Sequence, residues 1–284
     1  MAKVIAICNQ KGGVGKTTTA INLSTSLALS GKKILLIDID PQGNATSGLG
    51  IDKHTIKSSI YDLLIDEIDP RTIILKTSIE NLSLIPSNLS LTGAEVELVG
   101  IMGREYRLKK AIAVIAQQYD FVIIDCPPSL GLLTVNALSA AYSVLIPIQC
   151  EYYALEGLSQ LSGTVNLVRE NLNPSLAIEG VLMTMADYRT KHTNEVIDEV
   201  RKYFKDKVYS TVIPRNIRLT EAPSHGKPIS IYDKTSAGAQ KYQSFTEELL
   251  GVKKESAATK EPSEEMKAEP TILPDKELQK EEIC

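Results

Sequence analysis

Short apolar runs alternate with longer segments of helical periodicity along most of the chain. The runs are five to eight residues long and largely apolar, which is typical of strands buried on both faces of a parallel sheet. We expect strands at residues 4–8, 33–38, 82–86, 120–125, 144–149, 177–184 and 207–213. We expect helices at residues 16–29, 104–118, 155–170, 193–204 and 237–250.

This alternation predicts an α/β fold with a single doubly wound, mostly parallel sheet and helices on both faces. Ligands of such sheets bind at the carboxyl ends of the strands. Polar residues gather at those ends. A glycine-rich loop follows the first expected strand, Asp38 and Asp40 follow the second, and Asp125 ends the fourth.

The apolar pattern stops near residue 253. Residues 255–284 hold nine acidic side chains, four lysines and few apolar residues. A segment of this composition cannot bury enough apolar surface to fold by itself. We therefore predict a folded domain at residues 1–252 and a disordered acidic tail at residues 253–284. Because the tail is acidic and contains Pro270 and Pro274, it does not fit a membrane-binding amphipathic helix.

Composition excludes several classes of protein. No apolar run of about 18 residues is present, so we expect no membrane span. We expect no signal peptide, because the first expected strand begins at residue 4. The four cysteines, at positions 8, 126, 150 and 284, show neither zinc-site nor disulfide-framework spacing. The net charge of −4 comes mainly from the tail, and we expect a cytoplasmic protein.

The glycine-rich loop carries the strongest chemical signal. Residues 10–17 read Gln-Lys-Gly-Gly-Val-Gly-Lys-Thr and lie between an expected strand and an expected helix, which is the layout of a phosphate-binding P-loop. Glycines let backbone N–H groups point at phosphate oxygens, and the helix adds its positive N-terminal end. Lys16 is expected to neutralise the phosphates of ATP, and the Thr17 hydroxyl to ligate Mg²⁺.

The loop departs from the common P-loop pattern at its start. Gln10 stands where that pattern has glycine, and a second lysine, Lys11, follows it. One lysine suffices for the phosphates of one site, so Lys11 is either a solvated surface charge or has another task.

Three further segments support a nucleotide site. Asp125 is expected to hold Mg²⁺, directly or through water. In the turn after the second strand, Asp38 is a candidate to support the metal and Asp40 to position the attacking water. Pro214-Arg215-Asn216 follows the last strand, where a base would lie.

These segments resemble one family. Residues 11–17, 38–44, 123–128, 149–157 and 213–229 are similar to the corresponding blocks of the ParA/Soj chromosome and plasmid partition ATPases. That family has a deviant Walker A loop, as do MinD and the nitrogenase iron protein. The resemblance covers residues 2–250, and the blocks at 149–157 and 213–229 narrow it to the ParA/Soj group.

The resemblance implies a role for each matching residue. Lys11 matches the lysine that reaches the phosphates of the partner in an ATP-bound homodimer, and Gly12 matches a point of close approach between the chains. Lys11, Lys16 and Asp40 are the expected catalytic residues, and Thr17, Asp38 and Asp125 the expected metal-binding residues. The expected nucleotide-binding residues are Lys11, Gly12, Gly13, Val14, Gly15, Lys16, Thr17, Thr18, Pro214, Arg215 and Asn216.

The resemblance also implies partners. ATP-bound dimers of this family bind double-stranded DNA without sequence preference, and a ParB-type centromere-binding protein stimulates their weak ATPase activity. We expect a nucleoid-associated protein without a membrane partner. The expected DNA-binding residues are Arg189, Lys191, Lys202, Arg215 and Arg218.

Other readings stay open at this point. The main alternative is an ATP-gated scaffold that positions another cargo, as MinD-like proteins do. The P-loop begins at residue 10, so we expect no N-terminal domain for operator-specific DNA binding. An iron–sulfur reductase would need a second cysteine ligand for its cluster in addition to Cys126, and the sequence suggests none.

Overall fold

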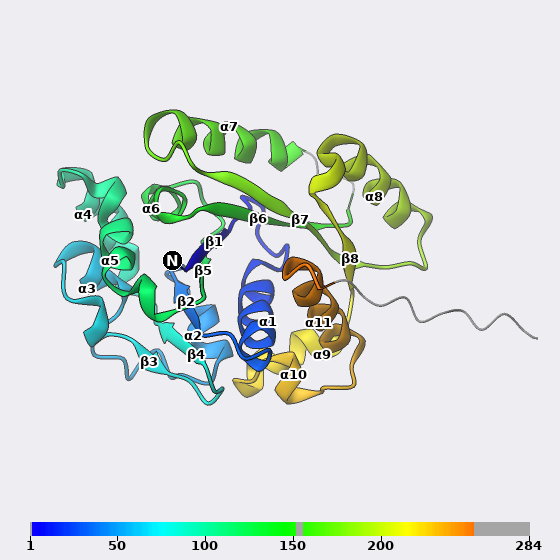
Figure 1. The fold of residues 1–284 in the computed structure, drawn as a ribbon, viewed down its shortest axis with the longest axis horizontal. Coiled ribbons are helices and arrows are strands. Elements are labelled where there is room, and N and C mark those ends of the chain that lie inside the picture. Colours follow the sequence, from blue (N-terminus) through cyan, green and yellow to red (C-terminus); the bar gives the residue numbers. More distant parts are fainter. Residues whose placement is uncertain (1, 152–155, 253–284) are drawn as a thin grey trace, which may run out of the picture. The chain divides into compact units, whose positions relative to one another are not determined.

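An eight-stranded sheet forms the centre of the protein (Figure 1). The computed structural model describes residues 2–151 and 156–252, so the tail predicted at residues 253–284 lies outside the described residues. The strand order is β3-β4-β2-β5-β1-β6-β7-β8. The strands are β1 (Lys3–Ile7), β2 (Ile34–Asp38), β3 (Leu75–Lys76), β4 (Leu82–Ile85), β5 (Phe121–Asp125), β6 (Ser143–Gln149), β7 (Ala177–Ala186) and β8 (Val208–Pro214).

The predicted doubly wound, mostly parallel sheet is confirmed. All seven expected strands are present within a few residues of the expected bounds. The strand that the sequence did not predict is β3, which pairs antiparallel with β4 at the sheet edge. Its two residues are too few to show any periodicity along the chain.

Helices precede or follow almost every strand. The expected helix at residues 104–118 is a single α-helix flanked by two 3₁₀ turns, Arg104–Tyr106 and Ala116–Gln118. Several shorter helices were not expected from the sequence. The helices are α1 (Lys16–Leu29), α2 (Asn44–Gly48), α3 (Ile60–Ile65), α4 (Leu91–Glu97), α5 (Arg107–Ile115), α6 (Leu132–Ala140), α7 (Glu156–Asn171), α8 (Lys191–Phe204), α9 (Ile217–Glu221), α10 (Ile229–Tyr232) and α11 (Ala237–Leu249).

The strands are continuously apolar because helices cover both faces of the sheet. In β1, Val4 and Ala6 join the core under α3 to α8, whereas Ile5 and Ile7 join the core under α1 and α11. Figure 1 shows α1 and α11 together on one side of the sheet and α6 and α7 on the other. The sheet is thus held rigidly from both sides, which suits a platform for a binding site.

Strand register fixes which polar residues meet at the ligand-binding edge. Strand β5 lies between β2 and β1. Asp125 is paired with Asp38 on one side and with Ile7, the last residue of β1, on the other. The loop at residues 8–15 therefore leaves the sheet directly beside Asp125.

Candidate nucleotide site

The loop between β1 and α1 has the backbone of a phosphate cradle. Gly13 and Gly15 have φ angles of 76° and 87°, which favour glycine, and Lys16 begins α1 immediately afterwards. Asn9 anchors the start of the loop, because its side chain accepts the N–H of Lys11 at 3.0 Å and donates to the Pro147 carbonyl at 2.7 Å. The Thr184 hydroxyl donates to the Val14 carbonyl at 2.9 Å. Neither anchor was predicted from the sequence.

Lys16 is buried in this loop, with 6% of its surface exposed. Its ammonium donates to the Lys11 carbonyl at 3.2 Å. Burial lowers the pKa of Lys16, and the nearby carboxylates of Asp125 and Asp40 oppose that shift. A buried cation with a single carbonyl acceptor among the described residues suits an anionic ligand such as a phosphate.

Asp125 fits a metal ligand better than Asp38 does. Asp125 is fully buried, and neither carboxylate oxygen has a hydrogen bond of good geometry among the described residues, although the Thr17 hydroxyl is close by. Burial and then the charge of Asp38 raise its pKa, while the Thr17 hydroxyl opposes the rise. Two such oxygens beside a hydroxyl suit the hard oxygen ligation of Mg²⁺.

Asp38 already has hydrogen-bond donors. Its carboxylate accepts the N–H and the hydroxyl of Thr46, each at 2.8 Å, and the N–H of Asp40 at 3.2 Å. Burial raises its pKa to about 6. Asp38 therefore holds the following turn in place, and its predicted contact with the metal stays a prediction.

The turn at residues 40–43 places Asp40 at the same edge. Asp40 is nearly buried, its carboxylate accepts the N–H of Gln42 at 2.9 Å, and its carbonyl accepts the Ser87 hydroxyl at 2.7 Å. Gly43 has a φ of 61°, and a Cβ there would lie 2.9 Å from the Ser87 carbonyl oxygen. Only glycine fits this turn, which keeps Asp40 near Lys16.

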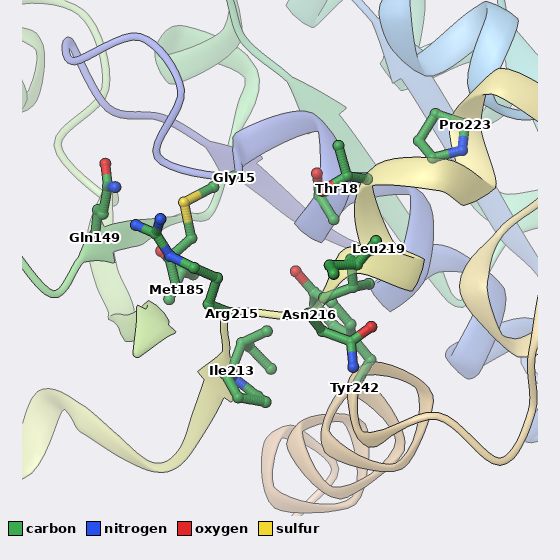
Figure 2. A pocket seen from close by; sticks show the side chains of 14 residues that line it. Gly15, Thr18, Gln149, Met185, Ile213, Arg215, Asn216, Leu219, Pro223 and Tyr242 are labelled. Atoms are coloured by element: carbon green, nitrogen blue, oxygen red, sulfur yellow. The ribbon is translucent and has the colours of Figure 1, made fainter. Parts of the chain in front are cut away.

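A cavity of about 640 Å³ opens beside the loop (Figure 2). It brings together the predicted residues Gly15, Thr18, Pro214, Arg215 and Asn216. The Asn216 side-chain oxygen is buried without a partner among the described residues, so it is available to a ligand's N–H group.

Apolar side chains form much of the wall of this cavity. Figure 2 shows Met185 and Arg215 on one side and Leu219 and Tyr242 on another. Met185 has a φ of 53°, an uncommon conformation for a residue with a side chain. The volume and the mixture of apolar wall and polar groups suit a nucleotide base. Sequence reasoning missed Met185 and Tyr242, because they reach the cavity only through tertiary packing.

The ammonium of Lys11 does not point into the phosphate cradle as the ammonium of Lys16 does. It is 3.4 Å from the Glu151 carboxylate, which is also 3.6 Å from the guanidinium of Arg215. Lys11 thus contributes its carbonyl to Lys16 and its charge to an exposed ion pair. Glu151 lies in a block that carried the family resemblance, yet only the fold shows that it contacts Lys11.

The three predicted DNA-binding arginines all lie just after the carboxyl ends of two neighbouring strands, at one edge of the sheet. Arg189 follows β7 and the other two, Arg215 and Arg218, follow β8; the two strands pair at Ala186 and Pro214. Arg189 contacts Asp187 at 2.8 Å, and Arg218 contacts Glu221 at 2.9 Å.

The two predicted lysines differ from these arginines. Lys202 lies in the last turn of α8, about 17 Å from the start of that helix at 1.5 Å per residue, so the structure does not bring it beside them. The side chain of Lys191 lies outside the described part of the chain.

Comparison with known proteins finds relatives that match most of the chain. A family model for an AAA domain matches residues 2–178. The chain is 61% identical to the sporulation initiation inhibitor protein Soj of Bacillus subtilis over 88% of this chain and 98% of that protein. It is 54% identical to the chromosome partitioning protein ParA of Myxococcus xanthus, over 88% of each chain.

A solved structure has the same fold. Cobyrinic acid a,c-diamide synthase from Mycobacterium smegmatis, solved with ADP and magnesium, has a TM-score of 0.78 and 39% identity over 88% of this chain and 94% of that one. The same protein was also solved with an ATP analogue and magnesium. Within the described residues, no helix has the length and apolar character needed to cross a membrane. The identity with Soj and ParA extends over nearly the whole described region, and the chain belongs to the ParA/Soj family of partition ATPases.

Proposed function

We propose that the protein is an ATPase that segregates DNA by switching between single and paired chains. Two chains bind ATP, pair face to face and bind DNA without sequence preference. Hydrolysis to ADP and phosphate then separates them. Support comes from the joined phosphate cradle, carboxylate cluster and base-sized cavity, and from relatives named Soj and ParA. The relative that holds nucleotide and magnesium supports ATP and Mg²⁺ as cofactors.

Each group at the site has a part in this proposal. Lys16 and the loop N–H groups bind the phosphates, and Thr17 and Asp125 hold Mg²⁺. Bound Mg²⁺ would neutralise charge on the phosphate oxygens. Asp40 orients the attacking water and takes up its proton. Pro214, Arg215 and Asn216 bind the base.

The position of Lys11 is the main observation that supports pairing of the two chains. Lys16 already supplies a cation to the cradle, while the Lys11 ammonium lies outside it beside Glu151. Exposed ion pairs of this kind contribute about 0 to 1 kcal/mol, so Lys11 can leave Glu151 readily. A triphosphate on a second chain offers it a much stronger partner. We infer that Lys11 acts on the partner's ATP.

Gly12 supports the same geometry. Its φ is not in the left-handed range, and a Cβ there would meet no described atom within 4 Å. Nothing inside the described chain requires glycine at this position. Close approach of a second chain would require a glycine there.

DNA binding in this proposal uses the edge formed by Arg189, Arg215 and Arg218. Each of these arginines has a carboxylate partner in the single chain. DNA phosphates would replace those carboxylates. Pairing doubles the number of phosphate contacts, which explains how ATP can control DNA affinity. A ParB-type protein that stimulates hydrolysis, and a location on the nucleoid in the cytoplasm, complete the proposal by analogy with the family.

Charge reversal at this edge tests the DNA-binding step. We expect the double variant Arg189→Glu with Arg218→Glu to bind DNA at least 10-fold more weakly in the presence of ATP, because phosphate contacts are lost on both chains. The slope of log affinity against log salt should become shallower by about 2 to 4. ATP turnover without DNA should be unchanged. Binding is measured by fluorescence anisotropy of a labelled duplex with ATP, with ADP and without nucleotide.

A matched control is available elsewhere on the surface. Arg71 forms the same local ion pair with Asp69 that Arg189 forms with Asp187, but it lies in a short turn before β3. Arg71→Glu should keep wild-type DNA affinity. If the double variant bound DNA with the same affinity as the wild type, the DNA-binding surface would not be at these arginines. Wild-type protein that never binds DNA with ATP would favour the scaffold alternative.

A further inference from the structure

Two buried thiols meet between the P-loop and the strand that carries Asp125. Cys8 follows β1 and Cys126 follows β5, so the two residues are 118 positions apart in the sequence. Their sulfur atoms are 2.9 Å apart. Both side chains are almost completely buried. The sequence predicted neither a zinc site nor a disulfide framework for its cysteines, and nothing in their spacing reveals the pairing of β1 with β5.

The backbone geometry at this point suits a disulfide. Ile7 pairs with Asp125, which places the following residues, Cys8 and Cys126, opposite each other. Neighbouring strands lie about 4.8 Å apart, and disulfides typically join Cα atoms about 4.4 to 6.8 Å apart. The sulfur atoms need to approach by about 0.9 Å to reach the S–S bond length. Bond formation thus needs only a small movement.

The contact between the two sulfur atoms distinguishes this pair from the third buried cysteine. Cys150 is a useful contrast, since it is also a free, buried cysteine. Burial raises the pKa of Cys150 to about 12.

We propose that Cys8 and Cys126 form a reversible redox pair that controls ATP binding. A hydroperoxide is the oxidant. One thiol sulfur takes an oxygen atom from hydrogen peroxide to give a sulfenic acid, and water leaves. The second thiol then attacks that sulfur, the S–S bond forms and a second water leaves. Overall, the two thiols lose two protons and two electrons to the peroxide. A dithiol reductant reverses the change.

The disulfide acts on the nucleotide site through the residues next to each sulfur. Asn9 follows Cys8 and anchors the P-loop to Pro147 and to the N–H of Lys11. Asp125 precedes Cys126 and is the expected metal ligand. Moving both by a fraction of an ångström disturbs the loop and the carboxylate together, so the loop N–H groups are no longer preorganised to bind phosphate. Oxidation therefore lowers ATP affinity in this proposal.

The test uses the full chain without nucleotide, treated with hydrogen peroxide. Peptide mass mapping should find Cys8 and Cys126 joined with the loss of two hydrogen atoms. Affinity for a fluorescent ATP analogue should fall at least 10-fold and return after dithiothreitol. The Cys126→Ala variant should keep its affinity under peroxide, while Cys150→Ala should respond as the wild type does.

Two outcomes would overturn the proposal. One is recovery of both thiols, or only their sulfinic and sulfonic acids, after peroxide treatment. The other is a disulfide with unchanged ATP affinity. The mass mapping does not depend on ATP binding, and the ATP affinity of the reduced protein tests the proposed ATPase function separately. A failure of the redox proposal can therefore be distinguished from a failure of the proposed function.

Discussion

Replacing Lys16 by alanine is expected to remove detectable ATP binding. Lys16 is the buried cation of the cradle, and its ammonium has only the Lys11 carbonyl as acceptor among the described residues. A charged group lost from a buried, hydrogen-bonded pair costs about 2 to 5 kcal/mol, or roughly 30- to 5,000-fold in affinity. Equilibrium titration with a fluorescent ATP analogue measures the loss directly.

The fold should tolerate the Lys16→Ala change. Burial already lowers the pKa of Lys16, so removing it also removes the cost of burying a charge. Burial is the main cause of the raised pKa of Asp125, and the charge of Lys16 is a smaller influence on it. Lys33→Ala is the matched control, because Lys33 is exposed at the other end of β2. If the Lys16→Ala variant bound ATP within about 3-fold of the wild-type affinity, the assignment of residues 10–17 as a P-loop would be contradicted.

Replacing Asp40 by alanine is expected to stop hydrolysis while leaving ATP binding nearly intact. A positioned general base contributes about 100- to 10,000-fold to a rate, so turnover should fall at least 100-fold. Pairing does not require hydrolysis, so the variant should accumulate as ATP-bound dimers on DNA. Phosphate release and light scattering after size exclusion measure the two effects.

Asp52 provides the control for this substitution. Asp52 accepts the N–H of His54 at 2.9 Å, the same local bond that Asp40 forms with Gln42, but it is exposed. Asp52→Ala removes a comparable turn contact away from Lys16 and should retain turnover. If Asp40→Ala hydrolysed ATP as the wild type does, Asp40 would have no part in catalysis.

Much of the fold was predictable because its signals are local. A strand buried on both faces gives a continuous apolar run, as in Ile34–Asp38, and the P-loop motif defines where α1 begins. Short elements left no such signal. Helix α2 has only five residues, and β3 has two, so neither shows a period.

The site was predictable only where its residues belong to contiguous motifs. The loop, Asp125 and Pro214-Arg215-Asn216 all lie at or near strand ends, as expected. Met185 and Glu151 were missed because their contacts depend on how distant segments pack. Among the ion pairs of the predicted DNA-binding arginines, the pair of Arg218 with Glu221 had a sequence signal, since a spacing of three residues on a helix favours contact.

Both distant and local contacts matter for the proposed switch. Glu151 holds the Lys11 ammonium near Arg215 in the single chain, so the proposed pairing and DNA-binding groups share one carboxylate. In this account, ATP on a partner chain draws Lys11 away from Glu151.

The central claim is that Lys11 of each chain completes the ATP site of the other. Its most direct test is the molar mass in solution of the Lys11→Ala variant with Mg²⁺ and ATP. We expect the variant to bind ATP within several-fold of the wild type yet to keep the mass of one chain, as should Gly12→Val, whereas the wild type doubles its mass. A Lys11→Ala variant that doubles its mass with ATP as readily as the wild type would contradict the account.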